Sequence, residues 1–342
     1  MEYFSVQWHI TDMCDQRCKH CYIFSEDNKK CIKEMNFEDI KRTYQEIKGM
    51  CKKLNKLPYL YITGGDPILH PNFWDLLEIC KKDNVPFTIL GNPFHLTYDN
   101  CKRMKELGCD KYQMSIDGLE KNHDWFRKPG SFKTTLEKID CINKAGIKSV
   151  IMTTVSGTNI KEIPDIIDLV VKYNVRVFAF GRYCPTSEEK SVGIAPLEYR
   201  NLLDICWKKY KEYIAKDCYT KFNLKDHLWK LYLYEEGLYK IPENMQEGFI
   251  YDGCNCGRSH ITILPTGVVY ACRRMESPVG NVLKDSLYNI WVSDNMNEYR
   301  QYDKFDKCSK CKLKLLCRGC PAVTKGLTGN MYNADPQCWM EV

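Results

Sequence analysis

Short apolar runs and amphipathic stretches alternate over the first 200 residues, and this alternation constrains the fold more than any other feature. Six runs are predicted strands: Phe4–Ile10, Tyr59–Thr63, Phe87–Leu90, Tyr112–Ile116, Ser149–Val155 and Val175–Phe180. Six stretches with helical periodicity follow them in turn: Phe37–Lys52, Asn72–Lys82, Tyr98–Glu106, Ser131–Lys144, Lys161–Lys172 and Leu197–Ile214. Such units predict parallel strands joined by right-handed crossovers. Six of them predict an α/β fold built on a partial (β/α)6 TIM-like barrel, short of the full eight.

The alternation stops near residue 217, which predicts three regions along the chain. Residues 1–216 form the barrel, and residues 217–252, rich in aromatic and charged residues, are predicted to be a bridging helical segment. Residues 253–342 combine short strand-like runs, turns and cysteines. They hold too little apolar material for a core of their own, so bound metal is expected to help them fold.

Composition and charge exclude several classes of protein. Of the 342 residues 44% are hydrophobic, and no run of 18 apolar residues occurs, which excludes a membrane-spanning helix. The N-terminus does not resemble a secretory signal, so a cytoplasmic protein is expected. The net charge is +6, with a basic run over residues 304–318 that lacks interleaved aromatics and so does not indicate nucleic-acid binding. That run is either a solvated face or a counter-charge to an anionic metal cluster.

Twenty cysteines are far more than a reduced cytoplasmic protein needs, and their placement indicates metal binding or catalysis. Three lie near the start, at Cys14, Cys18 and Cys21, and eight lie between Cys254 and Cys338. The other nine are scattered through strand-like and helix-like stretches. We expect most of those nine to pack as small apolar side chains.

The first three cysteines have the spacing C-x3-C-x2-C and directly follow the first predicted strand. Active sites of parallel α/β barrels form at this end of the strands. A tetrahedral zinc site with His20 as fourth ligand is one interpretation, although His20 adjoins Cys21 more closely than zinc ligands usually do. The other is a [4Fe–4S] cube held by three thiolates, whose fourth iron stays open to a substrate or cofactor.

This spacing after the first strand resembles the signature of the radical S-adenosylmethionine (SAM) superfamily. Gly64-Gly65-Asp66 after the second strand resembles the family's Gly-Gly-Glu motif, with aspartate in place of glutamate. Ser115 and Asp117 end the fourth strand, and Arg127 resembles the arginine that pairs with the SAM carboxylate. The resemblance implies a cluster on Cys14, Cys18 and Cys21, and SAM contacts at His20, Tyr22, Gly64, Gly65, Asp66, Asn92, Ser115, Asp117 and Arg127. It also implies reductive cleavage of SAM to a 5′-deoxyadenosyl radical.

The C-terminal cysteines follow a second pattern. A pair of zinc ribbons is one interpretation, but only five residues separate the two C-x2-C pairs, fewer than zinc ribbons usually have. Their order resembles the SPASM extension of some radical SAM enzymes, which implies two auxiliary [4Fe–4S] clusters. By that resemblance the first is held by Cys254, Cys272 and Cys320, and the second by Cys308, Cys311, Cys317 and Cys338. Only two residues separate Cys317 from Cys320 where the family more often has three. Cys256 is either a fourth ligand of the first auxiliary cluster or a free thiol.

The resemblance narrows the reaction to a few alternatives. Arg273 and Arg274 follow Cys272, where sulfatase-maturing members usually place an aspartate base. The segment from Cys272 to Val282 resembles ribosomal-peptide maturases, which favours thioether crosslinking of a precursor peptide. Carbon–carbon crosslinking, epimerisation and oxidation of a small molecule are the alternatives, and a non-enzymatic electron carrier or zinc scaffold is disfavoured.

Partners follow from the expected chemistry. An electron donor such as ferredoxin or flavodoxin is needed. The first strand begins almost at the N-terminus, so we expect either a separate protein that recognises the leader peptide or a peptide bound by the barrel and the bridging segment alone. Cys256 and Cys184, which follows the sixth strand, are the candidate catalytic thiols, and a hydrogen-atom donor of this kind would suit epimerisation.

Overall fold

The computed structural model describes residues 2–23, 34–185, 193–246 and 248–342. Cys31 lies outside these ranges. The chain forms two compact units, and each draws on separate segments. The first comprises Met1–Ile116, Glu120–Ile151 and Cys256–Arg300, and the second Asp117–Leu119, Met152–Asn255 and Gln301–Val342. The region boundaries drawn at 216 and 252 stay a prediction.

A mostly parallel sheet forms the centre of the first unit. Its strands are β1 (Tyr3–Thr11), β2 (Leu57–Gly64), β3 (Phe87–Leu90), β4 (Lys111–Ser115), β8 (His260–Ile263), β9 (Val268–Tyr270) and β10 (Pro278–Asn281), in the order β10-β9-β8-β1-β2-β3-β4. The pairs from β8 to β4 are parallel, whereas β9 pairs antiparallel with β8 and β10. The first four predicted strands are confirmed. The placement of β8 beside β1 was not predicted.

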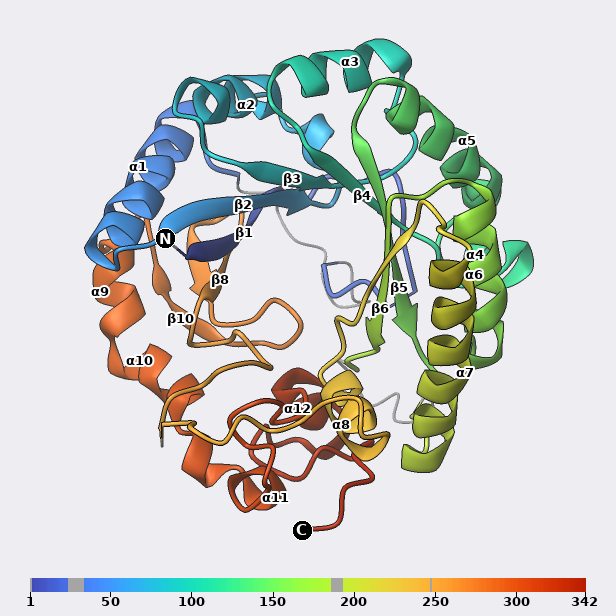
Figure 1. The fold of residues 1–342 in the computed structure, drawn as a ribbon. Helices are drawn as coiled ribbons and strands as arrows, with labels where there is room; N and C mark the ends of the chain where they lie inside the picture. Colours follow the sequence, from blue (N-terminus) through green and yellow to red (C-terminus); the bar gives the residue numbers. More distant parts are fainter. Residues whose placement is uncertain (1, 24–33, 186–192, 247) are drawn as a thin grey trace. The chain divides into compact units, whose positions relative to one another are not determined.

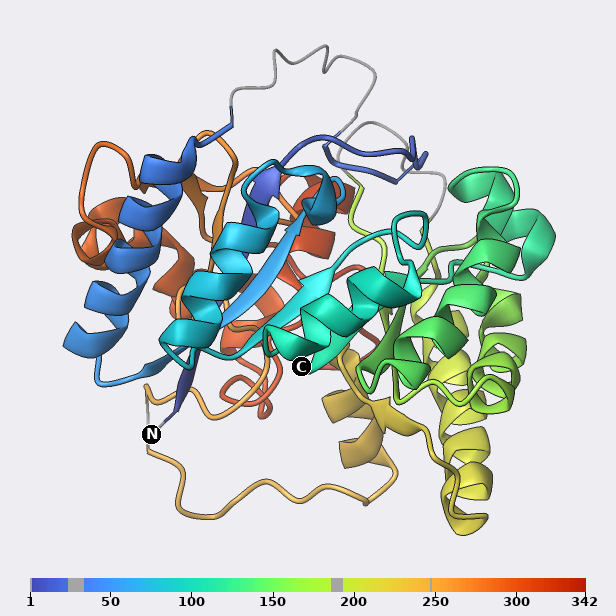
Figure 2. The same cartoon turned by 90° about the horizontal axis from the view of Figure 1, so that it is seen from above.

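Helices cover the sheet of the first unit. They are α1 (Phe37–Lys53), α2 (Phe73–Lys82), α3 (Tyr98–Glu106), α4 (Glu120–Phe126), α5 (Ser131–Lys144), α9 (Leu287–Val292) and α10 (Asp294–Asn297). Figures 1 and 2 show α1, α2 and α3 along the outer face of β1, β2 and β3. The side chains of Asn36 and Thr97 accept hydrogen bonds from the third residue of α1 and of α3, as N-caps do. Helix α4 was not predicted.

The two faces of this sheet differ sharply in polarity. Phe4, Val6, Trp8 and Ile10 on β1 are at most 1% exposed, and Phe4 packs edge-to-face on Trp291 of α9, with 4.8 Å between ring centroids. Because side chains alternate along a strand, the residues between them point the other way. In register, that opposite face carries Gln7, His9, Tyr61, Thr88, Thr262 and Tyr270, hereafter the polar face. Strands of parallel sheets are usually apolar on both faces, so this polarity is a feature of the site.

The second unit holds β6 (Val177–Arg182) paired in parallel with β7 (Lys221–Asn223), and the helices α6 (Ile163–Lys172), α7 (Pro196–Ala215), α8 (Leu228–Glu235), α11 (Asp306–Ser309) and α12 (Pro321–Thr328). β5 (Lys148–Val155) contributes residues to both units. Aromatic rings build much of the core of the second unit. The ring centroids of Tyr210 and Phe222 stack at 4.1 Å, and that of Trp229 lies 5.8 Å from those of both Tyr210 and Phe180.

The segment predicted to bridge the barrel and the cysteine-rich region is only partly helical. Residues 217–252 were expected to be helical, but they contain β7, and α8 is their only α-helix in the described ranges. Phe222 pairs with Phe178 as a strand residue and stacks on α7, so a tertiary contact overrides the local pattern. Gly237, with a φ of 67°, follows α8, and such a residue commonly ends a helix.

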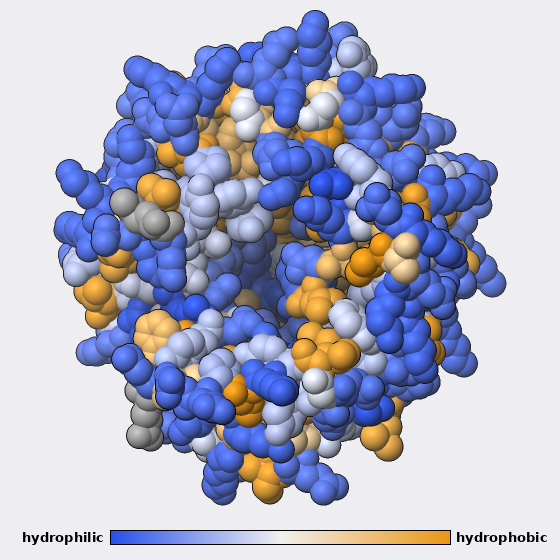
Figure 3. All heavy atoms as spheres, in the orientation of Figure 1, coloured by the Kyte–Doolittle hydropathy of each residue, from blue (hydrophilic) through white to orange (hydrophobic). Residues whose placement is uncertain are grey.

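No helix in the described ranges combines the length and the apolar character needed to cross a membrane. In the face shown in Figure 3, hydrophilic residues predominate and apolar residues are scattered between them.

Candidate functional site

The loop after β1 holds Cys14, Cys18 and Cys21, all partly exposed. Neighbouring elements donate hydrogen bonds to its sulfurs: Asn92 Nδ2 lies 3.1 Å from Cys14 Sγ, and Arg127 Nη1 lies 3.8 Å from Cys18 Sγ. The Lys19 amide also donates to the carbonyl of Phe126, the last residue of α4, at 2.8 Å. The loop is therefore held against the end of β3 and the end of α4, with donors directed at its thiols.

Two glycines bring the end of β2 into backbone contact with this loop. The Gly65 amide donates to Thr11 O at 2.9 Å, and the Asp66 amide donates to Met13 O at 2.7 Å. A Cβ on Gly65 would lie 2.2 Å from Met13 O, and one on Gly64 would lie 2.2 Å from Thr11 O. Only glycine permits this approach, because any side chain would push the two segments apart.

Asp66 is the buried carboxyl of the site. It is fully buried, its Oδ1 accepts from the Asn92 amide at 3.4 Å, and its Oδ2 has no partner among the described residues. Burial raises the pKa of Asp66 to about 7, although the Asn92 amide opposes that shift. Asp66 thus accepts from the backbone of Asn92, the same residue whose side chain donates to Cys14.

The structure gathers some of the other predicted SAM contacts at the loop and not others. The His20 ring meets Phe126 edge-to-face at 5.8 Å, and the Tyr22 ring lies under the Arg273 guanidinium at 4.2 Å. Ser115 is partly exposed at the end of β4. Asp117 belongs to the second unit, where its buried carboxylate accepts from the Thr154 amide at 2.8 Å.

A cavity in the second unit is lined by four cysteines, namely Cys308, Cys311, Cys317 and Cys338, together with apolar side chains such as Leu231, Leu313 and Met340. Burial raises the pKa of Cys308 to about 12, and the neighbouring Cys338 and Cys311 act in the same direction. Four thiols around one cavity fit a cluster with four thiolate ligands. In the described ranges, no three His, Cys, Asp or Glu side chains converge tightly enough to hold a single ion.

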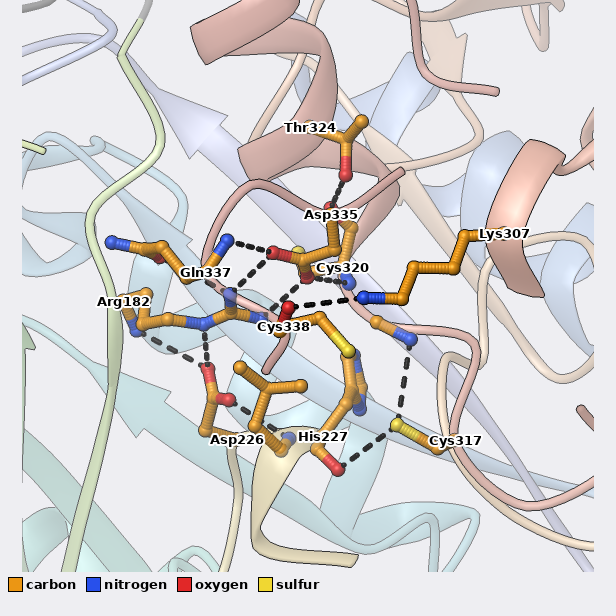
Figure 4. Close-up of polar contacts among 12 residues, drawn as sticks. Arg182, Asp226, His227, Lys307, Cys317, Cys320, Thr324, Asp335, Gln337 and Cys338 are labelled. Carbon is orange, nitrogen blue, oxygen red and sulfur yellow. Dashed lines mark hydrogen bonds and ion pairs between the residues drawn. The ribbon is translucent and has the colours of Figure 1, made fainter. Parts of the chain in front are cut away.

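A buried ion-pair network fixes the loops around these cysteines (Figure 4). Arg182, at the end of β6 and fully buried, makes two parallel contacts with Asp335, at 2.8 and 2.9 Å, and a third with Asp226 at 3.0 Å. Asp335 Oδ2 also accepts from the Cys320 amide at 2.9 Å, and the Asp335 carbonyl accepts from the Cys338 amide at 3.0 Å. Asp335 thus positions the backbone of two cysteines, Cys320 through its carboxylate and Cys338 through its main-chain carbonyl.

A second set of contacts closes the same region from the other side. Arg318, at a left-handed φ of 63°, donates to the carbonyls of Asp252 and Cys254 at 3.0 and 3.1 Å. Gly319, at φ 60°, leaves room for Asp335, since a Cβ there would lie 2.6 Å from its Oδ2. These backbone conformations bring Cys254, Cys317 and Cys320 onto one framework within the second unit.

His227 is a residue that the sequence did not reveal. It hydrogen-bonds Cys254 and lies near Cys320 and Asp226. Burial lowers the pKa of His227, but the Cys254 hydrogen bond and the negative groups around it outweigh burial and raise that pKa. The polar pair Asp226-His227 before the aromatic helix α8 was the available signal.

The remaining predicted cysteines lie in both units. Cys272 follows β9 in a turn closed by Ser277, whose Oγ accepts from the Cys272 amide at 3.0 Å and donates to its carbonyl at 2.8 Å. Cys256 is 7% exposed and its backbone bridges to His260. Cys184 is 8% exposed, one residue before the end of a described range.

Comparison with known families accounts for both cysteine sites. The model of the radical SAM superfamily matches residues 8–170, and that of the SPASM iron–sulfur cluster-binding domain matches residues 254–321. The chain is a radical SAM enzyme with a C-terminal SPASM domain. The fold class predicted from the sequence is confirmed, and SAM and iron–sulfur clusters are its cofactors.

Relatives of this radical SAM/SPASM enzyme differ in what they make. An AdoMet-dependent heme synthase from Nitratidesulfovibrio vulgaris is 25% identical, over 97% of this chain and 91% of that protein. The mycofactocin maturase MftC from Mycobacterium tuberculosis is 24% identical, over 97% and 81%. The SAM-bound crystal structure of SuiB from Streptococcus suis has the same fold, with a TM-score of 0.77 at 17% identity, over 99% of this chain and 78% of that one.

The glycine contact predicts the effect of one added methyl group. Gly65→Ala is expected to displace the cysteine loop, so the purified protein should lose iron and SAM cleavage together. The control is Gly49→Ala in α1, where nothing lies within 4 Å of the new Cβ; it should keep both. Iron per chain and 5′-deoxyadenosine formation are the measurements, and full iron with normal cleavage in Gly65→Ala would contradict the prediction.

Asp66 predicts a pH dependence of stability. Its folded pKa of about 7 lies above the unfolded value, so the folded chain holds a proton that the unfolded chain releases. The free energy of unfolding of metal-free protein should therefore fall as pH rises from 4 to 7, by at most about 4 kcal/mol at 1.36 kcal/mol per pKa unit. Asp66→Asn should remove this slope in urea titrations at pH 5 and pH 8. Equal slopes in both proteins would refute the assignment.

Asp335 predicts a linked loss of stability and metal. Asp335→Asn should lower the free energy of unfolding by about 3 kcal/mol, because it breaks a buried ion pair. It should also lower the iron content, while the Cys14 loop keeps cleaving SAM. Asp140→Asn, which removes an exposed ion pair with Lys144, is the control and should change stability by less than about 1 kcal/mol. Unchanged iron in Asp335→Asn would argue against a positioning role.

Proposed function

We propose that this enzyme oxidises a ribosomally made peptide and joins a cysteine sulfur to a carbon of the same peptide as a thioether. Each crosslink removes one hydrogen from carbon and one from sulfur, so the peptide loses two electrons in all. Such a reaction needs a group that abstracts hydrogen and a group that accepts an electron. Two separate sets of cysteines are consistent with that double requirement.

In this proposal Cys14, Cys18 and Cys21 hold the cluster that binds SAM, with Asn92 and Arg127 donating to the sulfurs of Cys14 and Cys18. Cys308, Cys311, Cys317 and Cys338 hold an auxiliary cluster in the cavity that they line. The residues Cys254, Cys272 and Cys320, with Cys256, are assigned to a third cluster by family resemblance. When bound, these groups supply a hydrogen-abstracting radical and an electron acceptor.

The polar face carries the case for a peptide. Gln7, His9, Tyr61 and Tyr270 offer hydrogen-bonding groups on the face of the sheet whose strands lead to the cysteine loop. A peptide presents an amide every few ångströms, and each amide that leaves water needs a partner. An apolar substrate would offer these hydrogen-bonding groups no partner beyond those they already have. The SuiB structure with bound precursor peptide SuiA is consistent with this proposal.

Oxidation of an iron porphyrin side chain is the second candidate. It is favoured by the heme synthase relatives, which match almost the whole chain at 24–25% identity. Decarboxylation of a propionate to a vinyl group is also a net oxidation and has the same cofactor needs. The number of hydrogen-bonding side chains on the polar face favours the peptide instead.

The remaining roles stay proposals of the same kind. The reductant is a ferredoxin or flavodoxin, a separate protein recognises the leader peptide, and the reaction takes place in the cytoplasm. Cys256 and Cys184 are proposed as functional thiols only if neither ligates a cluster. Both are nearly buried, so a substrate would have to approach them closely.

The ligand sets predict the metal content. Anaerobically reconstituted protein should hold about twelve irons per chain, as expected for three cysteine-held cubes, and no stoichiometric zinc. Replacing Cys14, Cys18 and Cys21 by alanine should remove about four irons and all SAM cleavage, and leave the second unit folded. One or two equivalents of zinc with little iron would refute the cluster assignment.

The reaction is tested with a precursor peptide. Small cysteine-containing peptides encoded beside the gene, co-expressed with the enzyme, should lose two hydrogens for each thioether, as read by mass spectrometry after thiol alkylation. The triple cysteine variant is the control and should leave the peptide unchanged. An unmodified peptide, together with vinyl formation on iron coproporphyrin III, would replace the first candidate by the second.

A further inference from the structure

Within the described residues, Arg273 differs from Arg182, Arg300 and Arg318 in lacking an anionic or carbonyl partner. Arg182, Arg300 and Arg318 each donate to carboxylates or carbonyls at 2.7–3.1 Å. Among the described residues, the Nε of Arg273 is buried without a hydrogen-bond partner, and its guanidinium contacts only the ring of Tyr22, 4.2 Å away. The residue as a whole is half-buried, and a buried N–H of a cation without an acceptor is unfavourable, so an absent anion is indicated.

His9 supplies a second unpaired donor on the polar face. It is 1% exposed, and its Nε2 lies 3.3 Å from the Nε2 of Gln7. An amide nitrogen can only donate, so His9 Nε2 accepts this bond and the ring proton is on Nδ1. Nδ1 is buried and has no acceptor within the described part of the chain. A buried N–H without an acceptor again indicates a missing group with lone pairs.

The two donors lie within electrostatic reach of each other. Burial holds the pKa of His9 well below its usual value, and the charge of Arg273 lowers it further. Burial raises the pKa of Tyr270, on the same face, and the charge of Arg273 opposes that rise. Arg273 directly follows Cys272, and Tyr22 directly follows Cys21 and lies near Cys272 as well. The 4.2 Å contact of Arg273 with Tyr22 brings the turn that carries Cys272 against the end of the cysteine loop, and His9 lies within range of the Arg273 charge; all of these residues belong to the first unit.

We propose that Arg273 and His9, with Tyr22 as the wall, form a subsite that binds a carboxylate of the substrate. The guanidinium offers two parallel N–H groups that match a carboxylate, and neutral His9 offers a third donor from Nδ1. Tyr22 holds the guanidinium plane from one side, which orients its fork. This deepens the proposed function, because it assigns to the substrate an acidic group beside the site of reaction. The carboxylate belongs either to an acidic residue of the peptide or to a porphyrin propionate.

The subsite is tested without turnover, using glutarate as the probe and its uncharged diamide, glutaramide, as the matched control. Saturation-transfer NMR on the SAM-loaded holoenzyme should detect glutarate and not glutaramide. Arg273→Gln should weaken glutarate binding about tenfold or more, as expected when a charge-assisted hydrogen-bond pair is lost. Arg103→Gln removes the same charge from the exposed side of α3 and should bind glutarate within about twofold of the unchanged enzyme.

His9 is tested by a pair of variants. His9→Leu removes the donor and should also weaken glutarate binding, whereas His9→Gln keeps an N–H and should retain part of it. If His9→Leu fails to fold, the arginine variants and His9→Gln still decide. The proposal is overturned if glutarate binds no better than glutaramide, or if Arg273→Gln binds it as the unchanged enzyme does.

The source of the carboxylate is assigned by competition. Acetyl-Gly-Glu-Gly-amide and coproporphyrin III are each titrated against bound glutarate, with the glutamine peptide and the tetramethyl ester as uncharged controls. Stronger displacement by the glutamate peptide assigns the subsite to a peptide side chain, and stronger displacement by coproporphyrin assigns it to a propionate. Because no step of this test requires SAM cleavage, a peptide that is never crosslinked would overturn the proposed function and leave the subsite standing.

Discussion

The site depends on how closely the backbone at the end of β2 approaches the loop that follows β1. Parallel pairing of β1 with β2 brings Thr11 beside Gly64. Just after β2, the amides of Gly65 and Asp66 donate to the carbonyls of Thr11 and Met13. A parallel sheet directs the C-terminal ends of its strands to one edge, so the donors from β3 and α4 reach the same loop. Because Gly64 and Gly65 carry no side chain, the backbone after β2 can hold the loop with the three cysteines, and the loop needs no apolar core of its own.

Local patterns predicted most of the first unit and the cysteine loop. Strands β1–β4 and helices α1, α2, α3 and α5 were found within two residues of their bounds, because their periodicity is local. The spacing of Cys14, Cys18 and Cys21 was likewise visible, and so was the glycine pair. Helix α4 was missed because its seven residues, after Gly118, are too few for a periodic window.

Long-range partners could not be predicted from the sequence. β8 pairs with β1 across some 250 residues, and Arg182 binds Asp335 at a separation of 153. No local sequence pattern near Arg182 or near Asp335 indicates that the two residues will meet. The same limit applies to His9 and Arg273, each ordinary in its own segment. Arg182 would be an unfavourable residue to bury alone, and its two carboxylates make it tolerable by providing opposite charge and directional acceptors at once.

The position of β1 in the middle of its sheet has a consequence for synthesis. One edge of β1 pairs with β2 soon after residue 64 is made, but the other waits for β8, which ends at Ile263. At 5–20 residues per second, that edge stays open for roughly 10–40 seconds on the ribosome. Throughout this interval the nascent chain presents an unpaired strand with Phe4, Val6, Trp8 and Ile10 beside it, and such an edge pairs readily with other chains. The residues most exposed to wrong pairing during synthesis are therefore those made first, although they end in the middle of the finished sheet.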